Sequence, residues 1–186
     1  MADKSFVQAV RQAAEGRLSA DAANVLVNLM DYIEENSWQG ACHACSSVLY
    51  VALSECGCDP RICIGECRYG VDGIPFDHSW VEVDGEPYDL ACAMRLDNSE
   101  PICPPVVGGL DVVAKGPTDM RYGIAFRGLD DEAQMVRVLP FGLYMDGWPN
   151  EPDGLWTVVG VCLGGHVDVD NLRRRYSDVE RVYVKG

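Results

Sequence analysis

The sequence lacks the features that would assign it to a membrane, to secretion or to nucleic acid. It has no run of 18 apolar residues, so no segment is predicted to span a bilayer. Its first residues, MADKSFVQAVRQAAEG, have no long apolar core of the signal-peptide kind, so we expect a cytoplasmic protein. Basic side chains are scarce: 15 Lys and Arg stand against 29 Asp and Glu, a formal net charge of −14. Such a chain repels nucleic acid and anionic membrane, so neutral or cationic partners are expected.

Internal repeats, low-complexity stretches and linkers that would force two domains are also absent. The chain has 186 residues, of which 48% are hydrophobic, and this is enough for a sizeable core. We therefore predict a single domain over residues 1–186. Within it, the chemistry is expected at about residues 38–92, followed by a C-terminal extension at about 104–186.

Cysteine, in contrast, is abundant. The odd number of nine, without an export signal, argues against a disulfide framework, so the thiols are core residues, metal ligands or catalytic groups. Four of them, Cys56, Cys58, Cys63 and Cys67, lie close enough in sequence to suggest a zinc site. Their spacing is not that of paired Cys-x-x-Cys knuckles, so we expect no bound metal and keep zinc binding as an alternative.

Local patterns predict an α+β fold. Helices are expected at 3–14, from the Ser19 cap to about Asn36, from Cys42 to Gly57, at 130–138 and at 170–176. Strands are expected at 61–67, 78–83, 86–91, 121–127, 155–163 and 181–184, and loops at 101–117 and 146–154.

Cys42 occupies a position that favours a reactive thiol. It begins the third predicted helix, where partial positive charge and free backbone N–H groups stabilise a thiolate. The same donors could stabilise an oxyanion, and Gly40 just before them allows a sharp bend in the backbone. Cys42 is therefore the candidate nucleophile.

A base and its orienting group are predicted on the following hairpin. Asp84-Gly85 is a two-residue turn signal, and pairing the strands outward from it places Val81 opposite Tyr88. In this register His78 and Asp89 are diagonal neighbours on one face, within side-chain reach. An aspartate there can fix the imidazole tautomer and stabilise its charged form.

These residues carry a resemblance to a known family. The segments GACHACSSVLYVALSECG, ICIGEC and DHSWVEVDGEPYDLA resemble the core of the transglutaminase-like superfamily, within the papain-like cysteine hydrolases. Gly40 and Cys42 match the nucleophile motif, His78 the His-x-Trp-Val-Glu motif, and Asp89 the third position. The resemblance implies a papain-like core with the catalytic helix packed on an antiparallel sheet. It also implies acyl-thioester chemistry on peptide or protein amides without a cofactor.

The sequence leaves several alternatives open. His43 directly after Cys42 departs from the family pattern, and some relatives are inactive, so a non-catalytic binding module on the same fold is the second hypothesis. Cys45 is a rival nucleophile that points into the apolar face of the helix. Gln39 is a candidate oxyanion donor. Trp148 and Trp156 could line a groove, although packing is the simpler interpretation. The substrate and the oligomeric state are not predicted.

Overall fold

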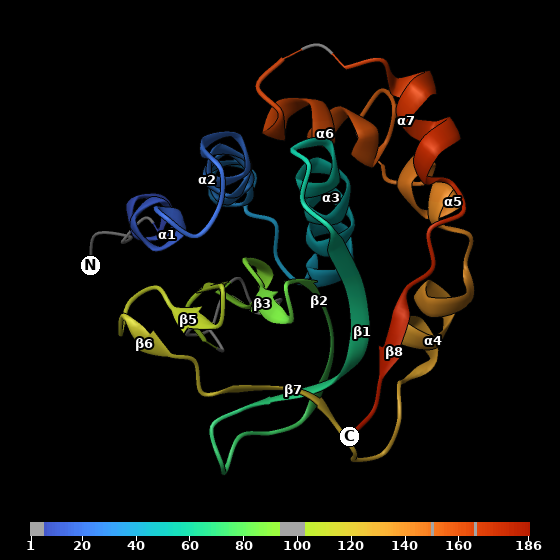
Figure 1. The fold of residues 1–186 in the computed structure, drawn as a ribbon. Coiled ribbons are helices and arrows are strands. Elements are labelled where there is room, and N and C mark those ends of the chain that lie inside the picture. Colours follow the sequence, from blue (N-terminus) through green and yellow to red (C-terminus); the bar gives the residue numbers. More distant parts are fainter. Residues whose placement is uncertain (1–5, 94–102, 150, 166) are drawn as a thin grey trace.

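The computed structural model of the chain describes residues 6–93, 103–149, 151–165 and 167–186. Helices surround a curled, mainly antiparallel sheet, so the predicted α+β class is confirmed (Figure 1). Helix α3, Cys42–Glu55, lies in the middle of the molecule between the N-terminal helices and those of the C-terminal half (Figure 1). Among the described residues, no helix has the length and apolar character needed to cross a bilayer.

The two N-terminal helices follow the predicted boundaries. Helix α1 covers Val7–Ala14, and the first three residues of its predicted range, 3–5, lie outside the described part of the chain. Helix α2 covers Ala20–Glu35 and begins as expected, because the Ser19 hydroxyl accepts a hydrogen bond from the amide of Ala22 at 3.3 Å. Helix α1 packs on α2, and α2 packs against one side of α3.

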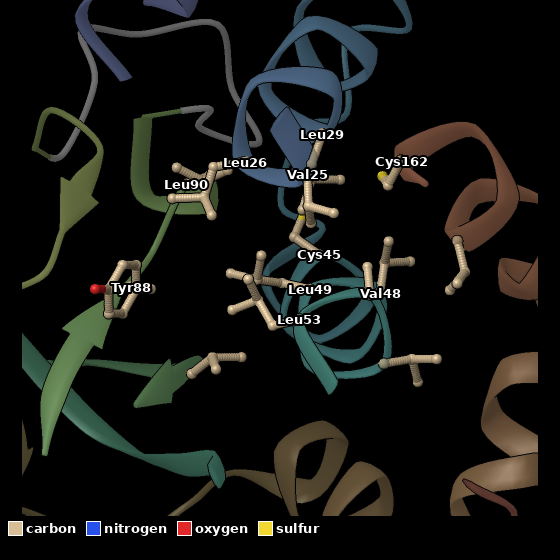
Figure 2. Close-up of a cluster of buried hydrophobic side chains, with 14 of the residues drawn as sticks. Val25, Leu26, Leu29, Cys45, Val48, Leu49, Leu53, Tyr88, Leu90 and Cys162 are labelled. Carbon is tan, nitrogen blue, oxygen red and sulfur yellow. The ribbon is translucent and has the colours of Figure 1, made fainter. Parts of the chain in front are cut away.

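Helix α3 is buried on nearly all sides, which is unusual for a helix of a small domain. Its apolar residues Val48, Leu49 and Leu53 interleave with Val25 and Leu29 of α2, as Figure 2 shows. Two polar residues on the helix, Ser46 and Ser47, satisfy their hydroxyls on the backbone carbonyl of His43, one turn earlier. This packing and these hydrogen bonds fix the position of the first turn of α3.

The main sheet has the order β3-β2-β1-β7, with β8 also paired to β1. Its strands are β1 Pro60–Tyr69, β2 Phe76–Val83, β3 Glu86–Tyr88, β7 Met120–Ile124 and β8 Val182–Val184. The outer edge of β1 is shared: β8 runs parallel to Cys63–Gly65, and β7 runs antiparallel to the part from Glu66 to Tyr69. Gly65 permits this approach, because a Cβ there would lie 2.5 Å from the carbonyl oxygen of Val184.

The β2–β3 hairpin has the predicted turn and register. Asp84 and Gly85 both have positive φ, 53° and 79°, as a two-residue turn of this kind requires. Val83 pairs with Glu86 and Val81 with Tyr88. The predicted extension of the second strand to residue 91 is wrong, because β3 ends at Tyr88. The backbone of Asp89 pairs instead with Val106, and a short 3-10 helix, η1, follows at Ala91–Ala93.

Two further predictions need correction. The predicted loop at 101–117, whose residues 101 and 102 lie outside the described part, contains a small sheet. Its strands are β4 Val106–Val107, β5 Leu110–Asp111 and β6 Gly116–Pro117. The predicted buried strand at 155–163 is a helix, α6 Leu155–Cys162, which packs on α2 and α3. An apolar run buried on most sides has no periodicity that separates strand from helix, and here the packed helices decide.

The rest of the C-terminal half is mainly helical, and its helices bury side chains in two separate clusters. Helix α4 covers Asp131–Val138, α5 covers Phe141–Asp146 and α7 covers Val169–Tyr176. Helix α5 lies in a stretch with no predicted element. The segment after residue 104 therefore contributes two strands to the main sheet and helices to the core around α3.

A buried carboxylate fixes the end of β7 to β1. The side chain of Glu66 in β1 accepts hydrogen bonds from the amides of Phe126, at 3.0 Å, and Arg127, at 2.9 Å. Burial raises the pKa of this carboxyl, but the amides of Arg127, Gly128 and Phe126 outweigh it, and the net pKa is lowered. Glu66 thus anchors the chain just beyond β7.

Replacing Glu66 by alanine is expected to lower the free energy of unfolding by about 2–3 kcal/mol, because charge-assisted hydrogen bonds of this kind contribute about that much. Glu66→Gln keeps an acceptor oxygen and is expected to cost about 1 kcal/mol. Urea unfolding of both variants measures the difference. Equal stability of Glu66→Ala and the unmutated chain would show that the anchor contributes nothing.

Candidate active site

Cys42 lies where the sequence places it, at the first residue of α3. Gly40 has a φ of 63°, a conformation that side chains rarely adopt, and this lets the chain turn into the helix. Ala41 occupies the cap position, and among the described residues no side chain caps this end of the helix. The partial positive charge and free donors of the first turn are therefore directed at the region of Cys42, whose side chain is partly exposed.

His78 and Asp89 form a buried pair. Nε2 of His78 lies 2.6 Å from Oδ2 of Asp89, and the two residues are 3% and 2% exposed. The predicted diagonal proximity is thus present, although Asp89 has left the hairpin. Its backbone pairing with Val106 and a hydrogen bond from the amide of Ala91 to its Oδ1, at 3.2 Å, hold it in place.

Tyr122 of β7 completes the surroundings of the aspartate. Its hydroxyl donates to Oδ2 of Asp89 at 3.1 Å, and its ring lies 4.9 Å from that of Trp80, centroid to centroid. The carboxylate therefore accepts hydrogen bonds from His78, Tyr122 and Ala91. Three donors on one buried carboxylate favour its ionised form.

Two imidazoles, those of His43 and His78, lie close enough to the Cys42 sulfur to act on its ionisation. Since Nε2 of His78 is occupied by Asp89, the other nitrogen, Nδ1, is the one left for the sulfur. Burial raises the pKa of the thiol. The hydrogen bonds from His43 and His78, together with their charges, outweigh burial and lower the pKa of Cys42 to about 5. At neutral pH this sulfur is a thiolate.

In the buried pair, the pKa of His78 is raised and the pKa of Asp89 is lowered. Burial lowers the pKa of His78, but the charge and hydrogen bond of Asp89 and the contact with Cys42 raise it well above its ordinary value. Burial raises the pKa of Asp89, and His78, Tyr122 and the Ala91 amide together lower it below its ordinary value. The favoured state is therefore a thiolate, an imidazolium and a carboxylate in sequence.

The rival nucleophile Cys45 has the opposite environment. It is 3% exposed within the apolar core between α2 and α3 (Figure 2). Burial, and then the nearby Cys42 and Asp89, raise its pKa well above the ordinary value. A neutral buried thiol is a poor nucleophile, so the site geometry favours Cys42.

The four cysteines of the zinc alternative do not converge. Cys63 and Cys67 are buried together beside Trp80, whereas Cys56 and Cys58 pack against the other core cluster at the end of α3. In the described ranges, no group of three or more His, Cys, Asp or Glu side chains is arranged to hold a metal ion.

The remaining candidates lie around the start of α3 or in the core. Gln39 is partly exposed in the turn before Cys42, and its oxyanion role stays a prediction. Trp156 is fully buried and donates to Asp146 at 2.8 Å, so its role is packing. Trp148 is partly buried against Trp38, with ring centroids 5.2 Å apart, and its role as a groove wall stays a prediction.

Sequence reasoning missed three residues of the site. Tyr122 lies in a weakly predicted strand, and no local pattern connects it with Asp89. Ser79, whose hydroxyl lies 2.7 Å from Nδ1 of His43, reads in sequence as an ordinary strand residue, and His43 stands out only as a departure from the family pattern. The single available signal was the position of His43, directly beside the nucleophile.

Comparison of the chain with family models, with curated proteins and with solved structures finds no match.

Proposed function

We propose that this chain is a cysteine-dependent amide-bond hydrolase or acyltransferase with a papain-like, transglutaminase-like core. The observation that carries the proposal is the placing of His78 between Cys42, whose ionisation it affects, and the buried Asp89, whose Oδ2 lies 2.6 Å from Nε2 of His78. It has the three parts that thiol catalysis needs: a thiol of low pKa, a base in contact with it and a group that orients the base.

The arrangement around the triad supports the same chemistry. The nucleophile begins a helix that packs on an antiparallel hairpin, as the resemblance implies. Free amides of the first helical turn are suited to the oxyanion of a tetrahedral intermediate. The net charge of −14 favours neutral or cationic peptide substrates.

The reaction follows from these roles. The Cys42 thiolate attacks the amide carbonyl carbon, and the helix-start amides stabilise the resulting oxyanion. The imidazolium of His78 gives its proton to the leaving amine, and an acyl thioester with Cys42 remains. His78, now neutral, then takes a proton from the attacking water or acceptor amine. The new acyl bond forms, the thioester C–S bond breaks, and Cys42 leaves as a thiolate. Asp89 keeps the tautomer fixed throughout.

Acylation by p-nitrophenyl acetate at about pH 6 tests the proposal. A thiol with a pKa of about 5 is mainly thiolate there, whereas an ordinary thiol is about 0.1% thiolate. The lower intrinsic nucleophilicity of a weakly basic thiolate offsets part of this gain, so Cys42 is expected to react roughly tenfold faster than Cys56. We expect a burst of one p-nitrophenol per chain, an acetyl group on Cys42 by mass spectrometry, and then steady turnover.

Two variants serve as controls. Cys42→Ala is expected to lose both burst and turnover, whereas Cys56→Ala, which removes another partly exposed thiol, is expected to keep them. A burst that survives in Cys42→Ala, or equal labelling of Cys42 and Cys56, would favour the binding-module hypothesis.

A further inference from the structure

His43 has an arrangement of its own beside the nucleophile. It follows Cys42 in the first turn of α3, and its imidazole acts on the ionisation of the Cys42 sulfur. Nδ1 of the same ring lies 2.7 Å from Oγ of Ser79 in β2, and Ser79 is 1% exposed. The ring of His43 is therefore held between the sulfur and a buried hydroxyl.

The backbone of His43 is fixed as well. Its carbonyl oxygen accepts hydrogen bonds from the hydroxyls of Ser46 at 3.1 Å and Ser47 at 2.6 Å. The buried guanidinium of Arg181 contacts Ser47 in turn, at 3.2 Å.

We propose that His43 is a second catalytic imidazole, which Ser79 holds against Cys42 so that hydrogen bonds from two sides stabilise the thiolate. The inference rests on the proposed function, because it assigns a role at the same nucleophile. Ser79 is a positioning residue, since it reaches the sulfur only through His43.

The two imidazoles have different roles because their hydrogen-bond partners differ. His78 is backed by the carboxylate of Asp89, which stabilises a charged ring and suits it to carry the proton. His43 is backed by a neutral hydroxyl, which can donate to Nδ1 and leave the ring proton on Nε2. That nitrogen then donates to the sulfur, so His43 stabilises the thiolate.

Three other titratable side chains lie near enough to Cys42 for its charge to affect their pKa values. They are Cys45 on the same helix, Cys67 on β1 and Tyr144 on α5. Burial holds the pKa of each above its ordinary value, so all three stay neutral while Cys42 ionises. The two histidines, with Asp89 behind His78, are therefore the groups that set the ionisation of Cys42.

The test is the pH dependence of Cys42 alkylation by iodoacetamide in the full chain, read by mass spectrometry with Cys56 as an internal reference. His43→Leu is expected to raise the alkylation midpoint by about 1–2 pH units, because it removes one hydrogen bond to a charged group. His43→Gln retains an amide donor and is expected to shift the midpoint less. Ser79→Ala is expected to raise it, and Ser79→Thr to restore it.

The pattern separates this inference from the proposed function. If acyl turnover is absent but His43→Leu still raises the midpoint, the second imidazole stands and the catalytic proposal fails. If turnover is present but the midpoint of His43→Leu equals that of the unmutated chain, the second imidazole is overturned.

A measurement on the unmutated protein covers the case in which a variant fails to fold. The chain has three histidines, so their ring signals can be followed by NMR before and after alkylation of Cys42. Loss of the thiolate is expected to shift the ring signals of both His43 and His78. A His43 signal that does not respond would overturn the inference.

Discussion

Replacing His78 by glutamine is expected to reduce acyl turnover at Cys42 by a factor of about 10² to 10⁴, which is the range that a positioned general acid–base contributes. Glutamine is close in size and polar, but it cannot give a proton to the leaving amine or take one from water. In this variant the buried Asp89 keeps the Tyr122 and Ala91 hydrogen bonds.

The same variant is expected to change the ionisation of the sulfur. Cys42 loses one of its two imidazole contacts, so its pKa rises from about 5 towards the ordinary value, and the alkylation midpoint rises with it. Glu82→Gln on the same strand is the matched control, since Glu82 bonds to Arg61 and Trp80 and has no contact with the sulfur in the described structure. Unchanged turnover in His78→Gln would remove His78 from the mechanism.

Asp89→Asn is expected to give the second-largest effect. The amide is nearly the same shape as the carboxylate, but it presents a donor where Nε2–H of His78 needs an acceptor. In serine proteases the corresponding change lowers turnover by about 10⁴ through the wrong tautomer. Here the loss is expected to be smaller, because the thiolate exists before the substrate binds. The alkylation midpoint of Cys42 is expected to rise, since His78 no longer carries a stabilised charge.

Tyr122→Phe provides a graded comparison, because it removes one of three donors to Asp89 and keeps the ring beside Trp80. Tyr122→Phe is expected to raise the alkylation midpoint of Cys42, but by less than Asp89→Asn does. If Asp89→Asn matches the unmutated chain in both turnover and pH profile, Asp89 does not orient His78.

The Asp89 pair also predicts a pH window for stability. The pKa of Asp89 is lowered in the folded state, so its contribution is present above its unfolded pKa of about 4 and is lost as the pH falls. The pKa of His78 is raised, so its contribution is complete below about pH 6.5 and is lost as the pH rises. The Tm difference between Asp89→Asn and the unmutated chain is therefore expected to be largest between about pH 4 and pH 6.5.

Local chemistry made part of the site predictable. Gly40 before an apolar helical pattern located the start of α3, and the Asp84-Gly85 turn fixed the hairpin register. Both signals depend on residues adjacent in sequence, where backbone sterics decide. From these two positions, Cys42 and His78 followed.

The parts of the site and fold that could not be predicted depend on contacts between segments distant in sequence. The position of Asp89 is set by Val106, and its hydrogen-bond partners include Tyr122, which no pattern near residue 89 reveals. Likewise, α6 is an apolar run whose helical state is set by packing on α2 and α3. The contact between His43 and Ser79 joins a helix to a strand, so it emerges only when the two are packed together.

The edge of β1 that β7 and β8 share has a consequence for how the chain folds. Cys63 of β1 pairs with Val182 of β8, far later in the sequence. Pairing of these two strands therefore closes a long loop, which carries a large entropic cost. During synthesis, helix α3 and the hairpin leave the ribosome well before β8 does, and until then the edge of β1 beside Gly65 exposes unpaired backbone groups. Such an edge is a template for pairing with other chains, so aggregation of the nascent protein competes with docking of β8.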